Sequence, residues 1–302
     1  MTLHPQAVAA LELWAQGSSV TDPGFGPADI DAQRAEARAA AALEPREDVD
    51  RVEDVDADGV RCRLYVPQYA PPAAPRAVVF LHGGGFVFGD LDTHDAQARR
   101  IANRKRSAVL SVDYRRPPEH RFPAAPDDVD TALGWLLVNA QRLGVDLGRV
   151  VALGDSAGGN LALVAALRNP DVLAACVLVY PFTDPTLSGV SYAATDGGMT
   201  RDEAAWFWRQ YARTPADLAD PDLAPYAATW FGTVPPTLVQ IAEHDVLADE
   251  DRELVRRLRD AGVPVEATTY DGMIHGFWRQ PQLFDAAEDA LAEIAAFLDR
   301  HV

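Results

Sequence analysis

The stretch RVVALGDSAGGNLALVAAL, from Arg149 to Leu167, decides the fold. Its first part, RVVALGD, is rich in β-branched and apolar residues, which is typical of a buried strand. Its second part, from Ala157 onward, is rich in alanine and leucine, which favour a helix. Small residues and one aspartate separate the two parts, so the strand turns directly into the helix. Ser156 lies at that turn.

A serine at such a turn is a candidate nucleophile. Its hydroxyl is a weak nucleophile at neutral pH and needs a neighbouring base and donors for the oxyanion that forms. A sharp strand-to-helix turn exposes the Oγ and requires small residues two positions before and after it, here Gly154 and Gly158. A phosphate loop is disfavoured because the stretch lacks a Lys-Ser/Thr pair and the G-x-G-x-x-G spacing. A plain glycine-rich connector remains the alternative.

The rest of the chain repeats the alternation of strand and helix. Nearly continuous apolar strings, expected to be strands, occupy residues 77–83, 108–114, 149–155, 174–181, 237–243 and 263–270. Helical patterns lie at about 95–105, 126–143, 157–168, 248–261 and 283–300. Strands of this composition are buried on both faces, as in a parallel sheet covered by crossover helices. The fold class is therefore α/β, with a mostly parallel central sheet flanked by helices.

Four segments stand outside this alternation. Two helical stretches, 3–16 and 29–43, precede it. The stretch RVEDVDADGVRCRLYVP at 51–67 has two period-2 runs around Asp58-Gly59, which predicts an antiparallel hairpin at the start of the sheet. The interval near 185–235, about fifty residues, is too long for a simple crossover and predicts an insertion over one end of the sheet.

Composition and charge exclude several classes of protein. The 302 residues include 27 basic and 45 acidic side chains, a net charge of −18 that repels phosphate backbones, so no nucleic acid partner is expected. No apolar run approaches the roughly 18 residues of a membrane span. The N-terminal MTLHPQAVAALELWAQ lacks the features of a secretion signal, so we expect a cytoplasmic protein. Cys62 and Cys176 lie in strand-like runs, which predicts buried thiols and no metal framework.

A second motif supplies donors for an oxyanion. The stretch FLHGGGFVFGD at 80–90 places three glycines after a strand, where backbone N–H groups meet a ligand without obstruction by side chains. Gly83 and Gly84 are the expected donors, with the N–H of Ala157 as the third. One such donor contributes about 2.7–4 kcal/mol of transition-state stabilisation. A simple turn would also account for three glycines, but two compatible motifs in one chain favour an acyl-transfer site.

The general base should follow Ser156, because enzymes with this serine turn place their catalytic residues in the order nucleophile, acid, histidine. Three histidines do so, namely His244, His275 and His301. His301 is the penultimate residue and is expected to fray. His275 lies in YDGMIHGFW, just past the last expected strand, where flanking glycines let the loop reach back over the sheet edge. We therefore predict that His275 is the base.

Asp245 is the expected acid, since it follows a strand directly. Neighbouring strand residues point to opposite faces, so only one of His244 and Asp245 should face the site. Asp249, Glu250 and Asp251 follow closely and remain less favoured candidates, because the helix dipole accounts for acidic residues in a first turn.

This arrangement predicts a complete hydrolytic cycle. Asp245 would hold the imidazole of His275, which would take the proton of Ser156 and later activate the water that hydrolyses the acyl-enzyme. No metal or organic cofactor is required. The cluster DLDTHD at 90–95 is interpreted as a polar helix start, in preference to a metal site.

Five motifs together resemble the hormone-sensitive lipase family of α/β-hydrolases, the bacterial family IV carboxylesterases, over roughly residues 76–300. They are HGGGF at 82–86, YRRPPEHRFPA at 114–124, GDSAGGNLA at 154–162, DVLADE at 245–250 and HGF at 275–277. The resemblance implies an α/β-hydrolase fold with Ser156, Asp245 and His275 as the triad and the glycines after His82 as the oxyanion loop. Arg116, Pro117 and Arg121 replace the commoner residues of YRLAPEHPFPA, which we interpret as a change in a supporting loop.

The resemblance also implies a helical cap built from the N-terminal helices and the insertion. The expected domains are N-terminal cap helices at 1–45, a catalytic domain at 46–184 and 236–302, and a cap insertion at 185–235.

Large aromatic residues crowd one expected helix of the insertion and the segment after it, namely Trp206, Phe207, Trp208, Tyr211, Trp230 and Phe231. Most are expected to attach the cap to the core, because adjacent aromatics cannot all face one cleft, while one or two line the pocket. An enclosed, mostly apolar site suits a small-molecule substrate, a short- to medium-chain acyl or aryl ester. No extended lipid-binding surface is recognisable, so an interfacial lipase is disfavoured.

Two alternatives to a carboxylesterase remain. Plant gibberellin receptors resemble this family but are binding proteins that have lost the catalytic histidine, whereas His275 is present here. An amidase or deacetylase would use the same triad, since the same acid–base groups protonate an amine leaving group.

By analogy with the fold, pairing of the last strand across a two-fold axis would give a homodimer.

Overall fold

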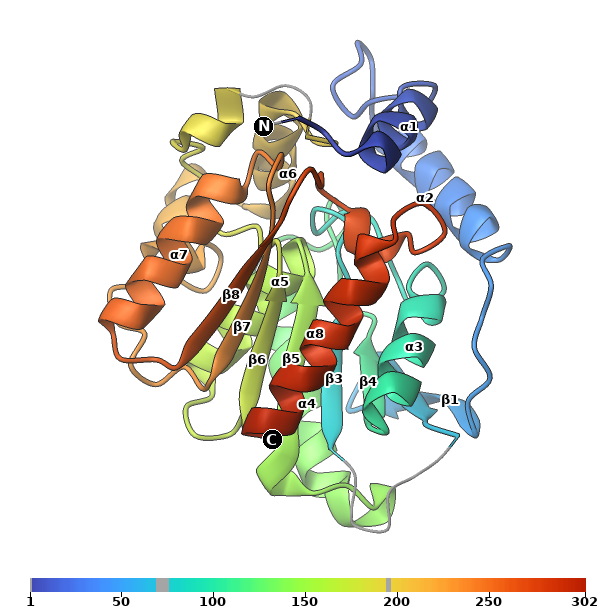
Figure 1. Cartoon of the computed structure of the whole chain (residues 1–302), viewed down its shortest axis with the longest axis vertical. Helices are drawn as coiled ribbons and strands as arrows, with labels where there is room; N and C mark the ends of the chain where they lie inside the picture. The colour runs from blue at the N-terminus through green and yellow to red at the C-terminus, as the bar shows by residue number, and fades with distance from the viewer. Residues whose placement is uncertain (1, 69–75, 194–196) are drawn as a thin grey trace.

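The computed structural model describes residues 2–68, 76–193 and 197–302. Within these residues, eight strands form one sheet in the order β1-β2-β4-β3-β5-β6-β7-β8 (Figure 1). Their bounds are β1 Arg51–Ala57, β2 Val60–Val66, β3 Ala77–Leu81, β4 Ala108–Val112, β5 Val150–Asp155, β6 Ala175–Val179, β7 Thr237–Ala242 and β8 Val265–Tyr270. The β1–β2 and β2–β4 pairs are antiparallel and the other pairs are parallel, so the predicted hairpin and the mostly parallel sheet are confirmed.

Helices cover both faces of the sheet. Their bounds are α1 Pro5–Trp14, α2 Pro27–Ala41, α3 Asp95–Lys105, α4 Ala124–Leu143, α5 Ala157–Arg168, α6 Arg201–Tyr211, α7 Ala248–Asp260 and α8 Ala286–His301. The buried side chains of α3 and α8 share one apolar cluster, and those of α4, α5 and α7 share the other. Figure 1 shows α8 crossing in front of the sheet, with α4 and α5 behind it. This is the layered arrangement that right-handed crossovers between parallel strands produce.

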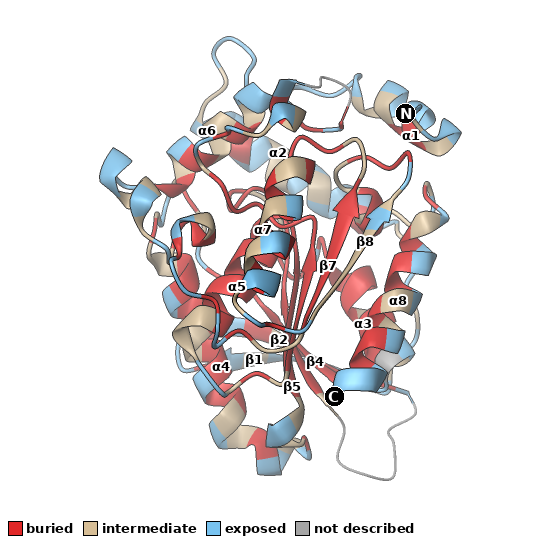
Figure 2. Cartoon of the chain, turned by 60° about the vertical axis from the view of Figure 1, so that its left-hand side comes forward, coloured by how far each residue is buried: buried red, intermediate tan, exposed pale blue. Residues whose placement is uncertain are grey.

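Strand periodicity divides the core into these two clusters. In β3, Val79 and Leu81 belong to the cluster under α4, α5 and α7, whereas Val78 and Phe80 belong to the cluster under α3 and α8. Alternating side chains point to opposite faces, so a central strand needs apolar residues at every position. Figure 2 shows the central strands as buried. β8 differs from the expectation that it is buried on both faces, because it is an edge strand and its residues are mostly half-buried.

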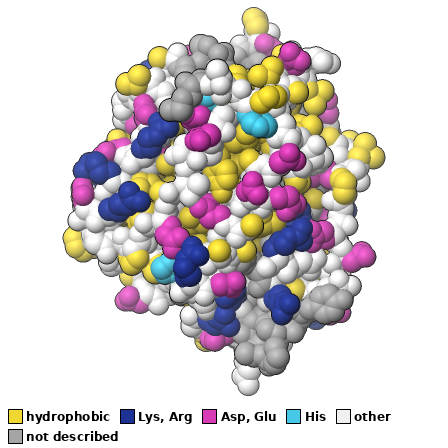
Figure 3. Space-filling model, in the orientation of Figure 1, with side chains coloured by type: hydrophobic (Ala, Val, Ile, Leu, Met, Phe, Trp, Pro, Cys, Tyr) yellow, Lys and Arg dark blue, Asp and Glu magenta, His cyan; other side chains and the backbone are white. Residues whose placement is uncertain are grey.

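The N-terminal helices and the insertion lie beside the ends of the strands. Between β6 and β7 the chain forms α6 and short 3-10 helices at Val190–Ala193, Pro215–Ala219 and Pro225–Ala227. α1 and α2 lie next to this insertion at one end of the molecule (Figure 1). Acidic and basic side chains are interspersed over the face in Figure 3. None of the helices in the described ranges is long and apolar enough to cross a membrane. Both cysteines are buried free thiols, as expected.

Candidate active site

Ser156 lies on a strained turn between β5 and α5. Its backbone has φ 54° and ψ −119°, in the positive-φ region that residues other than glycine rarely adopt. A Cβ on Gly154 would collide with the backbone of Gly158, and a Cβ on Gly158 would collide with the carbonyl of Leu81. The Ser156 N–H donates to Val179 O at 2.8 Å, which ties the turn to β6. The two glycines therefore allow the close approach that exposes the serine above the sheet.

His275 and Asp245 come from the loops after the two strands that follow the insertion. β7 precedes Asp245, β8 precedes His275, and both strands run parallel to β5, so all three loops emerge at the carboxyl edge of the sheet. His275 Nε2 lies 3.0 Å from Ser156 Oγ, and His275 Nδ1 lies 2.6 Å from Asp245 Oδ2. The carboxylate accepts the Nδ1–H, which leaves Nε2 free to accept the serine hydrogen.

Both partners of the serine are themselves held in place. Asp245 is buried, and its second carboxylate oxygen accepts the N–H of Leu247 at 3.0 Å. The backbone N–H of His275 donates to Gly197 O at 2.8 Å, and the ring of Tyr180 lies 4.8 Å from the imidazole. Burial opposes protonation of His275, but the charge and the hydrogen bond of Asp245 outweigh it, and the pKa of His275 is raised above its usual value.

The other candidate residues lie elsewhere. His301 pairs with Glu266 at the surface, and His244 Nε2 lies 3.6 Å from Glu243. Asp249 accepts the N–H of Ser191, which ties α7 to the insertion. Of the acidic residues considered, Asp245 is therefore the one that contacts His275.

Two of the acidic residues in the first turn of α7 are buried, which the helix dipole does not predict. Glu250 is buried and accepts the N–H groups of Thr183 and Asp184 and the hydroxyl of Tyr192. Asp251 is also buried, and neither of its carboxylate oxygens has a hydrogen-bond partner among the residues described. The dipole thus accounts for the position of these acids in the helix but not for their burial.

The predicted oxyanion donors need one correction. The N–H of Gly83 donates to Asp155 Oδ1 at 3.0 Å, so the expectation that it receives the oxyanion is wrong. Gly84 and Gly85 line the cavity at Ser156, and within the described chain their N–H groups have no protein acceptor. The N–H of Ala157 is likewise unpaired there, because it is the first residue of α5.

Sequence reasoning missed both Gly85 and Asp155. Burial raises the pKa of Asp155 to about 6, and its carboxylate, next to Ser156, holds the first glycine of the triplet. The run of three glycines was a signal that a third N–H was available. No local pattern shows which peptide planes turn toward the cavity.

A cavity of about 330 Å³ opens beside Ser156 and His275. Phe182, Met199 and Phe207 supply apolar surface, and α2 contributes Ala37. Of the six aromatic residues singled out in the insertion, Phe207 lines this cavity. The others do not: Trp208, Tyr211 and Phe231 are buried in the core, Trp206 stacks with Phe88, and Trp230 is 65% exposed.

The polar cluster at 90–95 forms the turn before α3. Asp90 Oδ1 accepts the N–H groups of Asp92 and Thr93, and α3 begins at Asp95, as the interpretation of a helix start predicts. Over residues 2–68, 76–193 and 197–302, no group of His, Cys, Asp or Glu side chains is arranged to hold a metal ion.

Comparisons with known proteins agree with this architecture. Residues 78–279 match the family described as alpha/beta hydrolase fold. Ethyl acetate hydrolase of Pseudomonas putida is 33% identical over the whole of both chains, and esterase LipI of Mycobacterium tuberculosis is 37% identical over 80% of this chain and 79% of its own. The solved structure of a hyperthermophilic esterase from Pyrobaculum calidifontis superposes with a TM-score of 0.87 at 36% identity, covering 99% of this chain and 98% of that one.

The chain belongs to the alpha/beta hydrolase fold family. The resemblance to the hormone-sensitive lipase type and the expected α/β-hydrolase fold are thereby confirmed. These relatives also confirm the expected enzyme class, a carboxylic ester hydrolase.

Proposed function

We propose that the protein is a serine carboxylesterase that hydrolyses short- to medium-chain acyl or aryl esters through Ser156, His275 and Asp245. The observation that carries the proposal is the position of His275, whose two ring nitrogens lie 3.0 Å from Ser156 Oγ and 2.6 Å from Asp245 Oδ2. A hydroxyl, an imidazole and a carboxylate in this order are what nucleophilic acyl transfer requires.

In the first half of the reaction, Ser156 Oγ attacks the ester carbonyl while His275 Nε2 takes the hydroxyl proton. The new C–O bond leaves a negative charge on the former carbonyl oxygen, which the N–H groups of Gly84, Gly85 and Ala157 stabilise. Collapse of this intermediate breaks the bond to the alkoxy group, which takes the proton from His275 and leaves as the alcohol. Asp245 stabilises the imidazolium throughout.

In the second half, water replaces the alcohol. His275 takes a proton from the water as it attacks the acyl-enzyme, and the proton then passes to Ser156 Oγ as the carboxylic acid leaves. Every step uses side-chain and backbone groups of this chain.

Several further assignments belong to the proposal. The cap comprises residues 1–45 and 185–235, and the catalytic domain comprises residues 46–184 and 236–302. This division is supported by Ala37, Glu203 and Phe207, which come from the two cap segments and line the cavity at Ser156. The size and apolar lining of that cavity support a small ester over a long-chain lipid. A cytoplasmic location and a homodimer stay predictions.

The test is hydrolysis of nitrophenyl esters from acetate to laurate by the wild type and by Ser156→Ala. The wild type should prefer short to medium chains, and the substitution should lower kcat by about 10⁶. Binding of esters without turnover by the wild type would instead favour a non-catalytic binding protein. Faster turnover of anilides than of the matched esters would favour an amidase.

A further inference from the structure

The oxyanion loop, defined as residues 82–90, is held from outside by arginine side chains. Gly84 and Gly85 have φ of 114° and 58°, a backbone region in which glycine is flexible, yet their N–H groups must keep one orientation to receive an oxyanion. Part of the restraint is internal, because Gly84 O accepts the N–H groups of Val87 and Phe88 at 3.1 and 2.8 Å. The next restraint along the loop comes from the cap helix α2.

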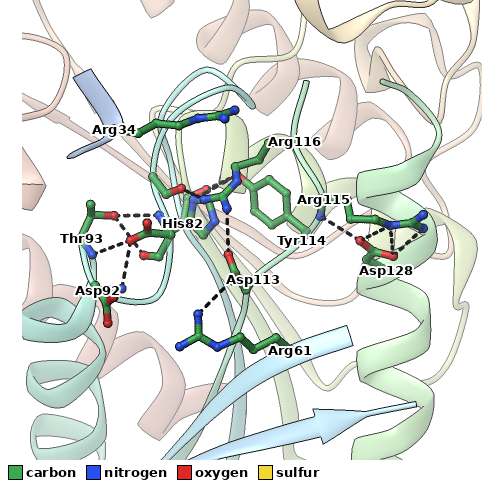
Figure 4. A network of polar contacts seen from close by, with 12 residues as sticks. Arg34, Arg61, His82, Asp92, Thr93, Asp113, Tyr114, Arg115, Arg116 and Asp128 are labelled. Atoms are coloured by element: carbon green, nitrogen blue, oxygen red, sulfur yellow. Dashed lines mark hydrogen bonds and ion pairs between the residues drawn. The ribbon is translucent and has the colours of Figure 1, made fainter. Parts of the chain in front are cut away.

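Arg34 of α2 connects three segments. Its Nε donates to Val87 O at 3.0 Å, and one terminal nitrogen donates to Pro117 O at 2.7 Å. Both terminal nitrogens also bond the carboxylate of Glu119, at 2.6 and 3.2 Å. The Arg34 side chain is only 10% exposed, and its bonds to the Val87 and Pro117 carbonyls are partly buried, whereas the Glu119 carboxylate lies at the surface. Figure 4 shows Arg34 above the two separate segments that carry His82 and Arg116.

The bond to Val87 acts on the turn that carries the two glycines. The peptide N–H of Val87 closes the turn back to Gly84, and Arg34 holds the carbonyl of the same residue. Val87 is fully buried, and over the described ranges Arg34 is the one partner of its carbonyl. Removing the guanidinium would leave this carbonyl unsatisfied, so the turn would shift to find another donor.

Two more arginines restrain the far end of the loop. Arg38, one turn further along α2, donates from Nε to Asp90 Oδ2 at 2.5 Å. Residues four apart lie on the same helix face, so Arg34 and Arg38 reach the loop side by side. Arg116 donates to Gly89 O and pairs with Asp113 at 3.2 Å, as Figure 4 shows. Arg34 differs from these two because its contact lies closest in sequence to the oxyanion donors.

We propose that Arg34 is a positioning residue for ester hydrolysis, which holds the Gly84–Gly85 amides toward the substrate by fixing the carbonyl of Val87. The inference rests on the proposed function, because it assigns Arg34 a role in the oxyanion step. Arg34 is not among the residues that line the cavity at Ser156, so it acts on the reaction through the loop and not by contact with the substrate. Loss of the contact should weaken stabilisation of the transition state more than binding of the ground-state ester.

The test compares Arg34→Met and Arg34→Lys with Arg259→Met. Arg34→Met keeps the aliphatic stem but removes every hydrogen bond. Arg34→Lys also keeps the charge and so protects the fold, but one ammonium cannot reproduce the planar fork that reaches Val87 O, Pro117 O and Glu119 together. Arg259 is exposed on α7 and has no ion pair or side-chain hydrogen bond within the described chain, so it is a matched control.

Arg34→Met should lower kcat for nitrophenyl butyrate by about 10- to 100-fold with KM within threefold of the wild type. Arg34→Lys should give a smaller loss of the same kind, and Arg259→Met should change neither constant. Affinity for a trifluoromethyl ketone, which forms an oxyanion on the serine, should fall by the factor by which kcat/KM falls. A merely structural role would lower the melting temperature without this parallel change.

The inference is overturned if either folded Arg34 variant keeps kcat within twofold of Arg259→Met, or if KM rises while kcat is unchanged. In both of those cases an active wild type leaves the proposed function intact. A wild type that hydrolyses no ester would overturn the proposed function, and the role of Arg34 with it.

Discussion

Replacing Asp251 by alanine is expected to stabilise the protein. Asp251 lies in the first turn of α7 and is fully buried, and neither carboxylate oxygen has a hydrogen-bond partner in the part of the chain described. Burial raises the pKa of Asp251 well above its ordinary 3.8, and the neighbouring charges of Glu250 and Asp245 raise it further. The folded protein therefore keeps a carboxyl group that would be better solvated in the unfolded chain.

The expected gain follows from three contributions. A buried polar group without a partner costs about 1–3 kcal/mol. Alanine also has a higher helix propensity than aspartate, by roughly 0.5 kcal/mol. Against these, the space left by the carboxyl group costs about 0.7 kcal/mol, taking ~24 cal/mol for each of some ~30 Å³. The net prediction is that Asp251→Ala raises the free energy of unfolding by about 1–3 kcal/mol near pH 7.

The effect should depend on pH with a definite sign. Because the pKa of Asp251 is raised in the folded state, the folded protein binds more protons at this site than the unfolded chain does. The site's contribution to stability is therefore lost progressively as pH rises above the ordinary carboxyl range. The difference between Asp251→Ala and the wild type should widen from pH 5 to pH 8.

Urea unfolding followed by tryptophan fluorescence at pH 5, 7 and 8 measures this difference. Asp260→Ala is the matched control, because Asp260 is an exposed aspartate at the other end of α7 that pairs only with Arg256 in the described chain. Its urea midpoint should match that of the wild type. An Asp251→Ala protein that is less stable than the wild type, or whose advantage is the same at all three pH values, would refute the reasoning.

Three further predictions concern activity. Gly158→Ala should lower kcat/KM for ester hydrolysis by at least about 100-fold, because the new Cβ would collide with the Leu81 carbonyl. Gly134→Ala is the control and should have no effect in the same assay, because a Cβ at Gly134 meets open space. The pH profile of kcat/KM should rise through a pKa above 6.5, because Asp245 outweighs the opposing effect of burial on the pKa of His275. Asp245→Asn should lower this pKa and should also lower kcat by about 10⁴. A pH profile that does not shift in Asp245→Asn would contradict the assignment of Asp245. Phe207→Ala should raise the ratio of kcat/KM for the octanoate ester to that for the butyrate ester by about 10-fold, because Phe207 lines the cavity. Trp230→Ala, at an exposed site, should leave this ratio unchanged. Equal ratios in the two variants would exclude Phe207 as a limit on acyl-chain length.

The features that the sequence could predict are those with a local cause. The turn at Ser156 needs Gly154 and Gly158 for steric reasons, and both glycines lie within two positions of the serine. The hairpin at Asp58-Gly59 and the buried central strands also follow from patterns a few residues long. The choice of His275 and Asp245 depended instead on the chain order nucleophile, acid, histidine and on the position of each residue just after an expected strand.

The features that were missed depend on contacts between distant segments. Gly83 was wrongly chosen as a donor because the side chain of Asp155, seventy-two positions away, takes its N–H. Arg34 lies in an alanine-rich helix that gives no sign of the Val87 carbonyl it meets fifty-three positions later. The sequence also gives no sign that Asp251 is buried, because acidic residues in the first turn of a helix are typical of solvent-exposed side chains.

The most direct test of the central claim is to trap the acyl-enzyme. Mixing the wild type with excess nitrophenyl butyrate and quenching in acid within milliseconds should give a burst of nitrophenol close to one equivalent and a butyryl mass increment on the peptide that contains Ser156. Ser156→Ala should give neither. Ester turnover without a burst or adduct in the wild type, or an adduct on another residue, would contradict the assignment of Ser156 as the nucleophile.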